Sequence, residues 1–265
     1  MSGPSIRSLL AVRDEGLVSA GVVVGAATYQ VLRPLGCTAR LGGYRRLSPS
    51  QAGTRLEYTS YVEGVTQTWH DAIERLEREA SDAGAHGVVG VTVRQGFIDN
   101  QSSVYQVQLV GTAVKVRGET PLPRPFLSML SMADTMKLLL RGWIPNGIGV
   151  GVSALHVHKW GTSAWYQRGA ALNNVEMTAP TTAVNSARRD AEIRLRHTDT
   201  LRGATAVVAT AVDVDISSDP CFNGEGLKAL VHMFGTGVVR FGPPTVPVDP
   251  SYDLSRKEEV ADLGD

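Results

Sequence analysis

Cysteine, net charge and long apolar runs are all scarce in this sequence, and each scarcity excludes a class of protein. The chain of 265 residues contains two cysteines, Cys37 and Cys221, whose spacing fits neither a disulfide framework nor a zinc knuckle. The 26 basic and 26 acidic residues cancel, so no overall field favours nucleic acid or an anionic membrane surface. With no secretory signal and no run of about 18 apolar residues, we expect a cytoplasmic protein without membrane insertion.

Catalytic motifs are missing as well. The sequence has no G-x-S-x-G, no H-E-x-x-H and no phosphate-binding loop ending in G-K-S/T. Its glycine-rich stretches, Gly21–Gly25 and Gly147–Gly151, lie within predicted strands, where close packing explains them. We therefore predict no catalytic residue and no cofactor-binding residue, and we do not expect an enzyme.

What the chain does contain is a pattern that occurs twice. The stretch Ala80–Val93 returns as Leu201–Val214, with Gly84 aligned on Gly203. In both copies a helix ends at the glycine and a buried strand is expected to begin. The offset is 119 residues here, 126 in the opening strands (Gly25 to Gly151) and 124 in the closing strands (Gly111 to Gly235). Such repetition predicts two similar units.

Each unit reads as strand, long loop, helix, strand and strand. The first has a valine-rich strand over Leu17–Leu32, expected to be buried on both faces or in an interface, and a connection from Arg33 to Ser60. An amphipathic helix over Thr66–Ala83 and an alternating strand over Val104–Val116 follow. The second opens with a helix over about 131–141 and a strand over about 147–160, and a short helix over 5–13 precedes the first.

Prolines divide the chain into its expected parts. We predict a first domain at residues 1–117, a proline-rich linker at 118–125 and a second domain at 126–242. Residues 243–265, with six acidic and two basic residues and four prolines, are expected to form a flexible acidic tail.

Several of these segments carry a resemblance to a known family. They are Glu74–Val91 and Val110–Val114 in the first half, and Leu139–Ser153, Ile193–Thr210 and Phe234–Val238 in the second. Each half resembles the YbjQ-like family, whose members are often labelled putative heavy-metal-binding proteins. The resemblance covers most of residues 5–241 and implies a tandem duplication. It implies an α+β protein of two two-layer α/β domains, each with one helix on a small antiparallel sheet and a short N-terminal helix, assembled into cyclic rings, commonly pentamers.

Two histidines are the best candidates for a metal site. His156 and His158 lie two apart on a predicted strand, so both imidazoles project from one face and could share a divalent metal with further ligands. The alternative is two ordinary histidines near a strand end. The aligned residues of the first half are Gln30 and Leu32, so a metal would bind asymmetrically.

Other polar residues have simpler explanations. Asp213 and Asp215 share a strand face and could supply oxygen ligands, but such pairs more often mark a solvated face. Cys37 and Cys221 are expected to be inert thiols, and His70 an ordinary helix-surface histidine.

Two functions from different classes remain. The first is a ring-forming cytosolic homo-oligomer, pentamer favoured, that acts as a scaffold or interaction protein and engages a protein partner through its tail, where Tyr252 and Leu254 lie among acidic residues. The alternative is a metal- or small-ligand-binding protein that uses the ring lumen or the subunit seam.

Overall fold

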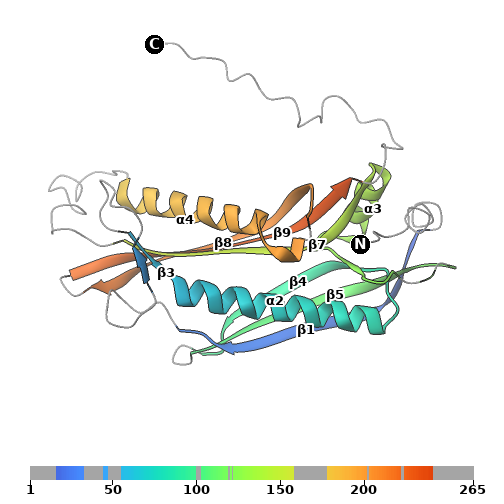
Figure 1. Ribbon diagram of the computed structural model, residues 1–265, viewed down its shortest axis with the longest axis horizontal. Coiled ribbons are helices and arrows are strands. Elements are labelled where there is room, and N and C mark those ends of the chain that lie inside the picture. Colours follow the sequence, from blue (N-terminus) through green and yellow to red (C-terminus); the bar gives the residue numbers. More distant parts are fainter. Residues whose placement is uncertain are drawn as a thin grey trace, which may run out of the picture.

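The computed structural model of this chain describes residues 16–32, 44–46, 55–99, 103–118, 120, 122–157, 178–201, 203–221 and 224–240 (Figure 1). The strands are β1 (Leu17–Gln30), β2 (Tyr44–Arg46), β3 (Arg55–Tyr58), β4 (Gly87–Phe97), β5 (Val104–Val116), β6 (Phe126–Leu127), β7 (Trp143–Val157), β8 (Ala206–Cys221) and β9 (Gly224–Arg240). The helices are α2 (Thr59–Asp82), α3 (Met132–Leu140), α4 (Thr178–Arg196) and the 3-10 turn η2 (Asp199–Leu201). The predicted helix at 5–13, the tail and His158 lie outside the described residues.

The strands form two sheets. Sheet A has the order β1-β5-β4-β6 and sheet B the order β2-β3-β7-β9-β8. All pairings are antiparallel except the short parallel contact of β4 with β6. The mixed α+β class and the alternating strand Val104–Val116 are thus confirmed.

The long connection after β1 differs from the prediction of an irregular loop. It contains β2 and β3, and β3 pairs with β7, with Arg55 opposite Val157. Residues from the first half therefore complete the second sheet. Short strands with proline and glycine nearby carry too little periodicity to be recognised from the sequence.

Helix α2 begins at Thr59, about two turns before the predicted start at Thr66. Its added residues are not a solvent-exposed extension, because Tyr61, Val62 and Val65 are buried. The helix ends as predicted: Gly84 follows with φ +63°, a conformation that glycine adopts without strain.

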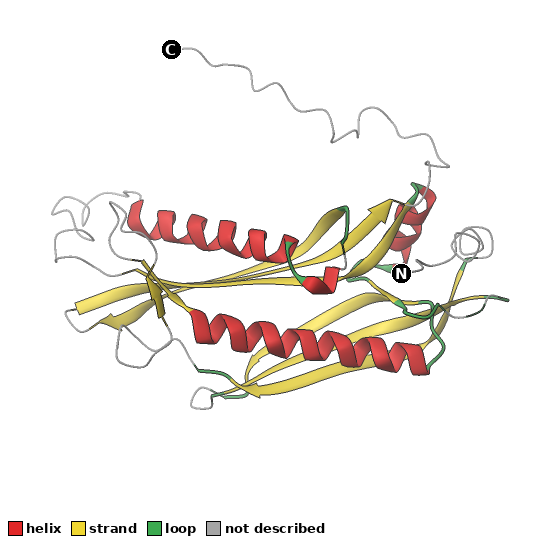
Figure 2. Cartoon of the chain, viewed as in Figure 1, coloured by secondary structure: helices red, strands yellow, loops and turns green. Residues whose placement is uncertain are grey.

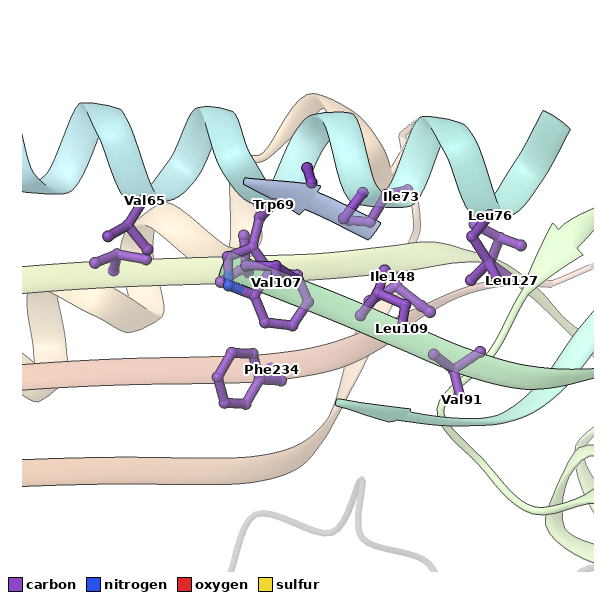
Figure 3. Packing of buried hydrophobic residues seen from close by; sticks show 14 of the residues in the cluster. Val65, Trp69, Ile73, Leu76, Val91, Val107, Leu109, Leu127, Ile148 and Phe234 are labelled. Carbon is purple, nitrogen blue, oxygen red and sulfur yellow. The ribbon is translucent and has the colours of Figure 1, made fainter. Parts of the chain in front are cut away.

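Helices and sheets alternate through the molecule. Figure 2 shows α4 on one side of sheet B, and α2 between sheet B and the strands of sheet A. One core cluster contains Leu76 and Leu109 of the first half together with Ile148 and Phe234 of the second (Figure 3). Trp69 of α2 stacks on Phe234 of β9 with ring centroids 4.9 Å apart. The halves share a core, and the domain boundaries at 117 and 126 stay a prediction.

The second half also follows the sequence closely. Helix α3 lies where a helix was expected at 131–141, and the Ser131 hydroxyl caps it by accepting a hydrogen bond from the Asp134 amide at 3.1 Å. Strand β7 is buried along almost its whole length because α4 covers one face and α2 the other. Of the helices that the structure describes, none combines the length and the apolar character that crossing a membrane requires.

A close contact recurs in the two halves. A Cβ atom on Gly25 of β1 would collide with the carbonyl oxygen of Ala72 in α2, and one on Gly151 of β7 with that of Ala191 in α4. Only glycine allows the helix to approach the strand this closely. Each half thus seats its helix on its first long strand in the same way.

Candidate functional site

The structure describes one of the two histidines predicted to bind a metal. His156 lies in β7 and is fully buried. Its Nδ1 is 3.3 Å from the hydroxyl of Tyr58, whose ring meets the imidazole edge-on with centroids 6.1 Å apart. His156 therefore takes part in the packing between β3 and β7.

A metal site needs several ligands around one point. Within the described ranges, no group of three or more histidine, cysteine, aspartate and glutamate side chains is placed to hold a metal ion. The described neighbours of His156 thus do not supply a ligand set. Because His158 lies outside these ranges, the His156 and His158 pair stays a prediction.

The remaining polar candidates are scattered. Asp213 and Asp215 are exposed on β8, and Asp213 lies opposite His232 of β9. His70 lies on α2 with its Nε2 3.4 Å from the Thr198 hydroxyl. Cys221 ends β8, and Cys37 lies outside the described residues. Among the described side chains, Asp213, Asp215 and His70 form no group that could hold a metal ion.

A different polar cluster lies at the seam between the halves, centred on Gln95 of β4. The Gln95 Oε1 accepts a hydrogen bond from Trp69 Nε1 at 3.0 Å and one from the Tyr105 hydroxyl at 2.8 Å. Its Nε2 lies 3.0 Å from Nδ1 of His232, and the Nε2 of His232 is 3.2 Å from the Tyr61 hydroxyl. Three of these groups come from strands and two from α2.

The donors in this cluster fix the protonation of His232. The indole N–H of Trp69 can only donate, so the Gln95 oxygen must face it and the Gln95 amide must face His232. The amide then donates to Nδ1, which leaves the proton of the neutral imidazole on Nε2, pointing at the Tyr61 oxygen. Both ring nitrogens are therefore engaged by protein groups, and neither offers a lone pair to a metal.

Burial controls the electrostatics of the cluster. Burial lowers the pKa of His232 to about 4, although the carboxylates of Asp213 and Asp215 act in the opposite direction. Burial also raises the pKa of the Tyr61 and Tyr105 hydroxyls, and the same acidic strand contributes. All of these groups are neutral near pH 7, and the cluster acts as a polar clamp between the halves.

No pattern in the sequence indicates this clamp. Gln95 and His232 are 137 positions apart, and each belongs to a strand whose partner in the other half is not evident from periodicity. The internal repeat does not indicate the contact either. Gln95 aligns with Val214 and His232 aligns with Gln108, so the pair is not repeated in the other half.

Two apolar strand faces point outward. On β1 the exposed residues Val22 and Val24 lie opposite the side that packs on α2. On β8 large apolar side chains are also exposed: Val208, Val212, Val214 and Ile216. The buried strand expected to begin within Leu201–Val214 is in fact an exposed edge strand, because α4 covers β7 and β9 and reaches little of β8.

Comparison with known proteins identifies one segment of the chain. Residues 50–117 match the family model YbjQ_1, described as "Putative heavy-metal-binding". The match covers β3, α2, β4 and β5, and the last three of these elements carry Tyr61, Trp69, Gln95 and Tyr105 of the Gln95 cluster. No curated protein matches the chain. These residues identify a YbjQ-like domain in the first half of the chain.

Proposed function

We propose that this protein is a homo-oligomeric scaffold or interaction protein of the cytoplasm, without catalytic activity, in which copies of the chain associate through exposed strands. The observation that carries the proposal is the pair of apolar faces on β1 and β8. Both strands are sheet edges, which natural proteins usually protect with charges or cover with another element.

The exposed apolar side chains lie close enough together on each strand to support an interface. Val22 is 69% exposed and Val212 and Ile216 are each 48% exposed. Burying such a side chain fully contributes about 1.5–3 kcal/mol, so a few of them buried together support an interface. Clustered apolar surface of this kind is typical of protein contact sites.

A tandem duplication supports the idea of a repeated assembly. The contact of Gly25 with α2 is matched by that of Gly151 with α4. Arg75 donates to the Ala26 carbonyl, and Arg194 donates to the Val152 carbonyl at 2.9 Å. The sequence offsets of 119 and 126 relate the members of each pair, and bulges recur at aligned positions of β4 and β8. We infer that the halves arose from one unit.

Duplicated units favour cyclic assembly. When unlike surfaces of the same chain meet, the association closes into a ring if the rotation between copies allows it. Rings, commonly pentamers, are what the family resemblance implies, and a pentamer is the size we favour. Engagement of a protein partner by the tail at residues 243–265 is part of the proposal and concerns residues outside the described ranges.

A second candidate is binding of a metal or small ligand at the ring lumen or subunit seam. The family description of heavy-metal binding and the pair His156 and His158 favour it. A divalent metal held by imidazoles is the chemistry expected. Its ligand set would have to include groups beyond those that the described residues bring together.

Native mass spectrometry of the full chain, with and without added zinc, separates the two. The scaffold proposal predicts a discrete multimer of 28.3 kDa chains whose mass does not change with zinc. A stoichiometric mass increase, lost in a His156→Ala variant, would favour the ligand-binding candidate. A monomer at all concentrations would contradict the oligomer.

A further inference from the structure

We propose that the chain binds a second copy of itself head to tail, with the valine face of β1 on one copy docked beside α4 and against the apolar row of β8 on the next. The inference rests on the proposed oligomer and adds to it the two surfaces and their polarity. We define face 1 as Val22 and Val24 of β1 with the exposed Gln106 and Gln108 of the neighbouring strand β5. Face 2 is the row Val212, Val214 and Ile216 of β8.

The template is the seam inside the chain. One face of sheet B, formed by Ile148, Val150 and Val152 of β7 with residues of β9, packs against the first half. On the other side of the seam lie α2 and the partly buried β4 residues Val93 and Phe97. This contact joins the sheet of the second half to the helix α2 and the strand β4 of the first half.

Face 1 is the first-half counterpart of the sheet B side of that seam. The offset of 126 maps Ile148 to Val22 and Val150 to Val24. The register agrees, because β1 and β7 each carry a bulge just before the aligned glycines of positions 21 and 147. The apolar residues are kept at these positions, yet only in the second half are they buried.

Face 2 is the second-half counterpart of the other side of the seam. The offset of 119 maps Val93 to Val212 and Phe97 to Ile216. Cross-strand pairing places Val212 opposite Met233 and Val214 opposite Val231, both of which pack beneath α4. The row therefore lies on the α4 side of sheet B and is exposed beside the helix.

Face 1 and face 2 correspond to the two sides of the seam, and within one chain neither has a surface to pack against. Face 1 lacks a helix and a strand like the α2 and β4 that cover β7, and α4 and β8 of another copy provide them. The faces differ, so the contact is heterologous and continues from copy to copy. Exposed Gln106 and Gln108 on sheet A and Arg188 on α4 make it more polar than the seam, where Trp69 stacks on Phe234. The contact between copies is accordingly weaker than the seam.

Complementary defects test the polarity. Variant 1 carries Val22→Asp and Val24→Asp, and variant 2 carries Val212→Asp and Val214→Asp. All four side chains are exposed, and near-ultraviolet circular dichroism checks that each variant is folded. The matched control is Ile193→Asp, which is 51% exposed on α4 at the position aligned with Glu74, outside the seam.

Size-exclusion chromatography with light scattering gives the result. We expect a multimer for the wild type and the control, a single chain of 28.3 kDa for each variant alone, and twice that mass for their equimolar mixture. The mixture recovers one contact because each variant retains one intact face. Dimers of either variant alone would indicate like-to-like pairing and overturn the inference while leaving the oligomer standing. Variants that assemble like the wild type would also overturn it, whereas a monomeric wild type would overturn the proposed function itself.

Discussion

His232 is predicted to make the stability of the protein depend on pH. Its pKa is lowered to about 4 by burial between β9 and the first half, whereas a histidine in the unfolded chain titrates near 6.5. The unfolded chain therefore binds the proton more tightly. The stability that neutral His232 provides is complete above pH 6.5 and is lost as the pH falls toward 4.

The size of the effect follows from the two pKa values. Between pH 7 and pH 5, the linkage relation gives a loss of about 2 kcal/mol in the free energy of unfolding. Asp213 and Asp215 oppose the shift, and their influence is already contained in the lowered value. The hydrogen bond from Gln95 to Nδ1 adds a preference for the neutral ring.

The assay is urea unfolding at one protein concentration at pH 7 and pH 5, for the wild type and a His232→Asn variant. The asparagine keeps an acceptor for Gln95 but does not titrate, so its loss between the two pH values should be smaller by about 2 kcal/mol. A Phe234→Leu control weakens the same seam without a titrating group and should retain the wild-type pH dependence. Equal losses in wild type and His232→Asn would refute the reasoning.

Two further predictions concern Gly151 and Arg194, two residues of the second half whose contacts have counterparts in the first half. Gly151→Ala should destabilise the protein by about 3 kcal/mol in thermal or urea unfolding, because its Cβ collides with the backbone of α4. Gly118→Asn, at φ +78° in open space, should cost less than about 1 kcal/mol, and equal effects would contradict the close approach. Arg194→Met should cost about 3 kcal/mol, because the buried carboxylate of Glu57 loses its ion pair with Arg194. The aligned Arg75→Met, which loses a hydrogen bond at an exposed site, should cost about 1 kcal/mol, and the reverse order in urea unfolding would show that the ion pair is not the cause.

The elements set by local pattern were predictable from the sequence. Helix α3 lies within the predicted span, and the alternation of Val104–Val116 correctly assigned one face of β5 to the core. Gly84 follows the end of α2 with a positive φ, as expected, whereas α4 ends at Arg196 and the 3-10 turn η2 lies between it and Gly203. In each case a few adjacent residues contain the information.

Features set by distant contacts were not predictable. The burial of a strand depends on what covers it. Asp213 and Asp215 indicated one solvated face of β8, but the exposure of Val212, Val214 and Ile216 on its other face follows from its edge position. Strand β3 forms because its backbone pairs with β7, which lies far away in the sequence. The clamp at Gln95 likewise requires His232 of the second half. The repeat predicted two similar units, but not that the back of one sheet would rest on the helix of the other.

The most direct test of the account is a cryo-electron microscopy structure of the assembled particle. We predict that Val22 and Val24 of each copy lie against the α4 side of β8 of the next, and that this contact superposes on the seam at Ile148 and Val150. A particle in which β1 meets β1, or in which face 1 remains exposed to solvent, would contradict the head-to-tail assembly.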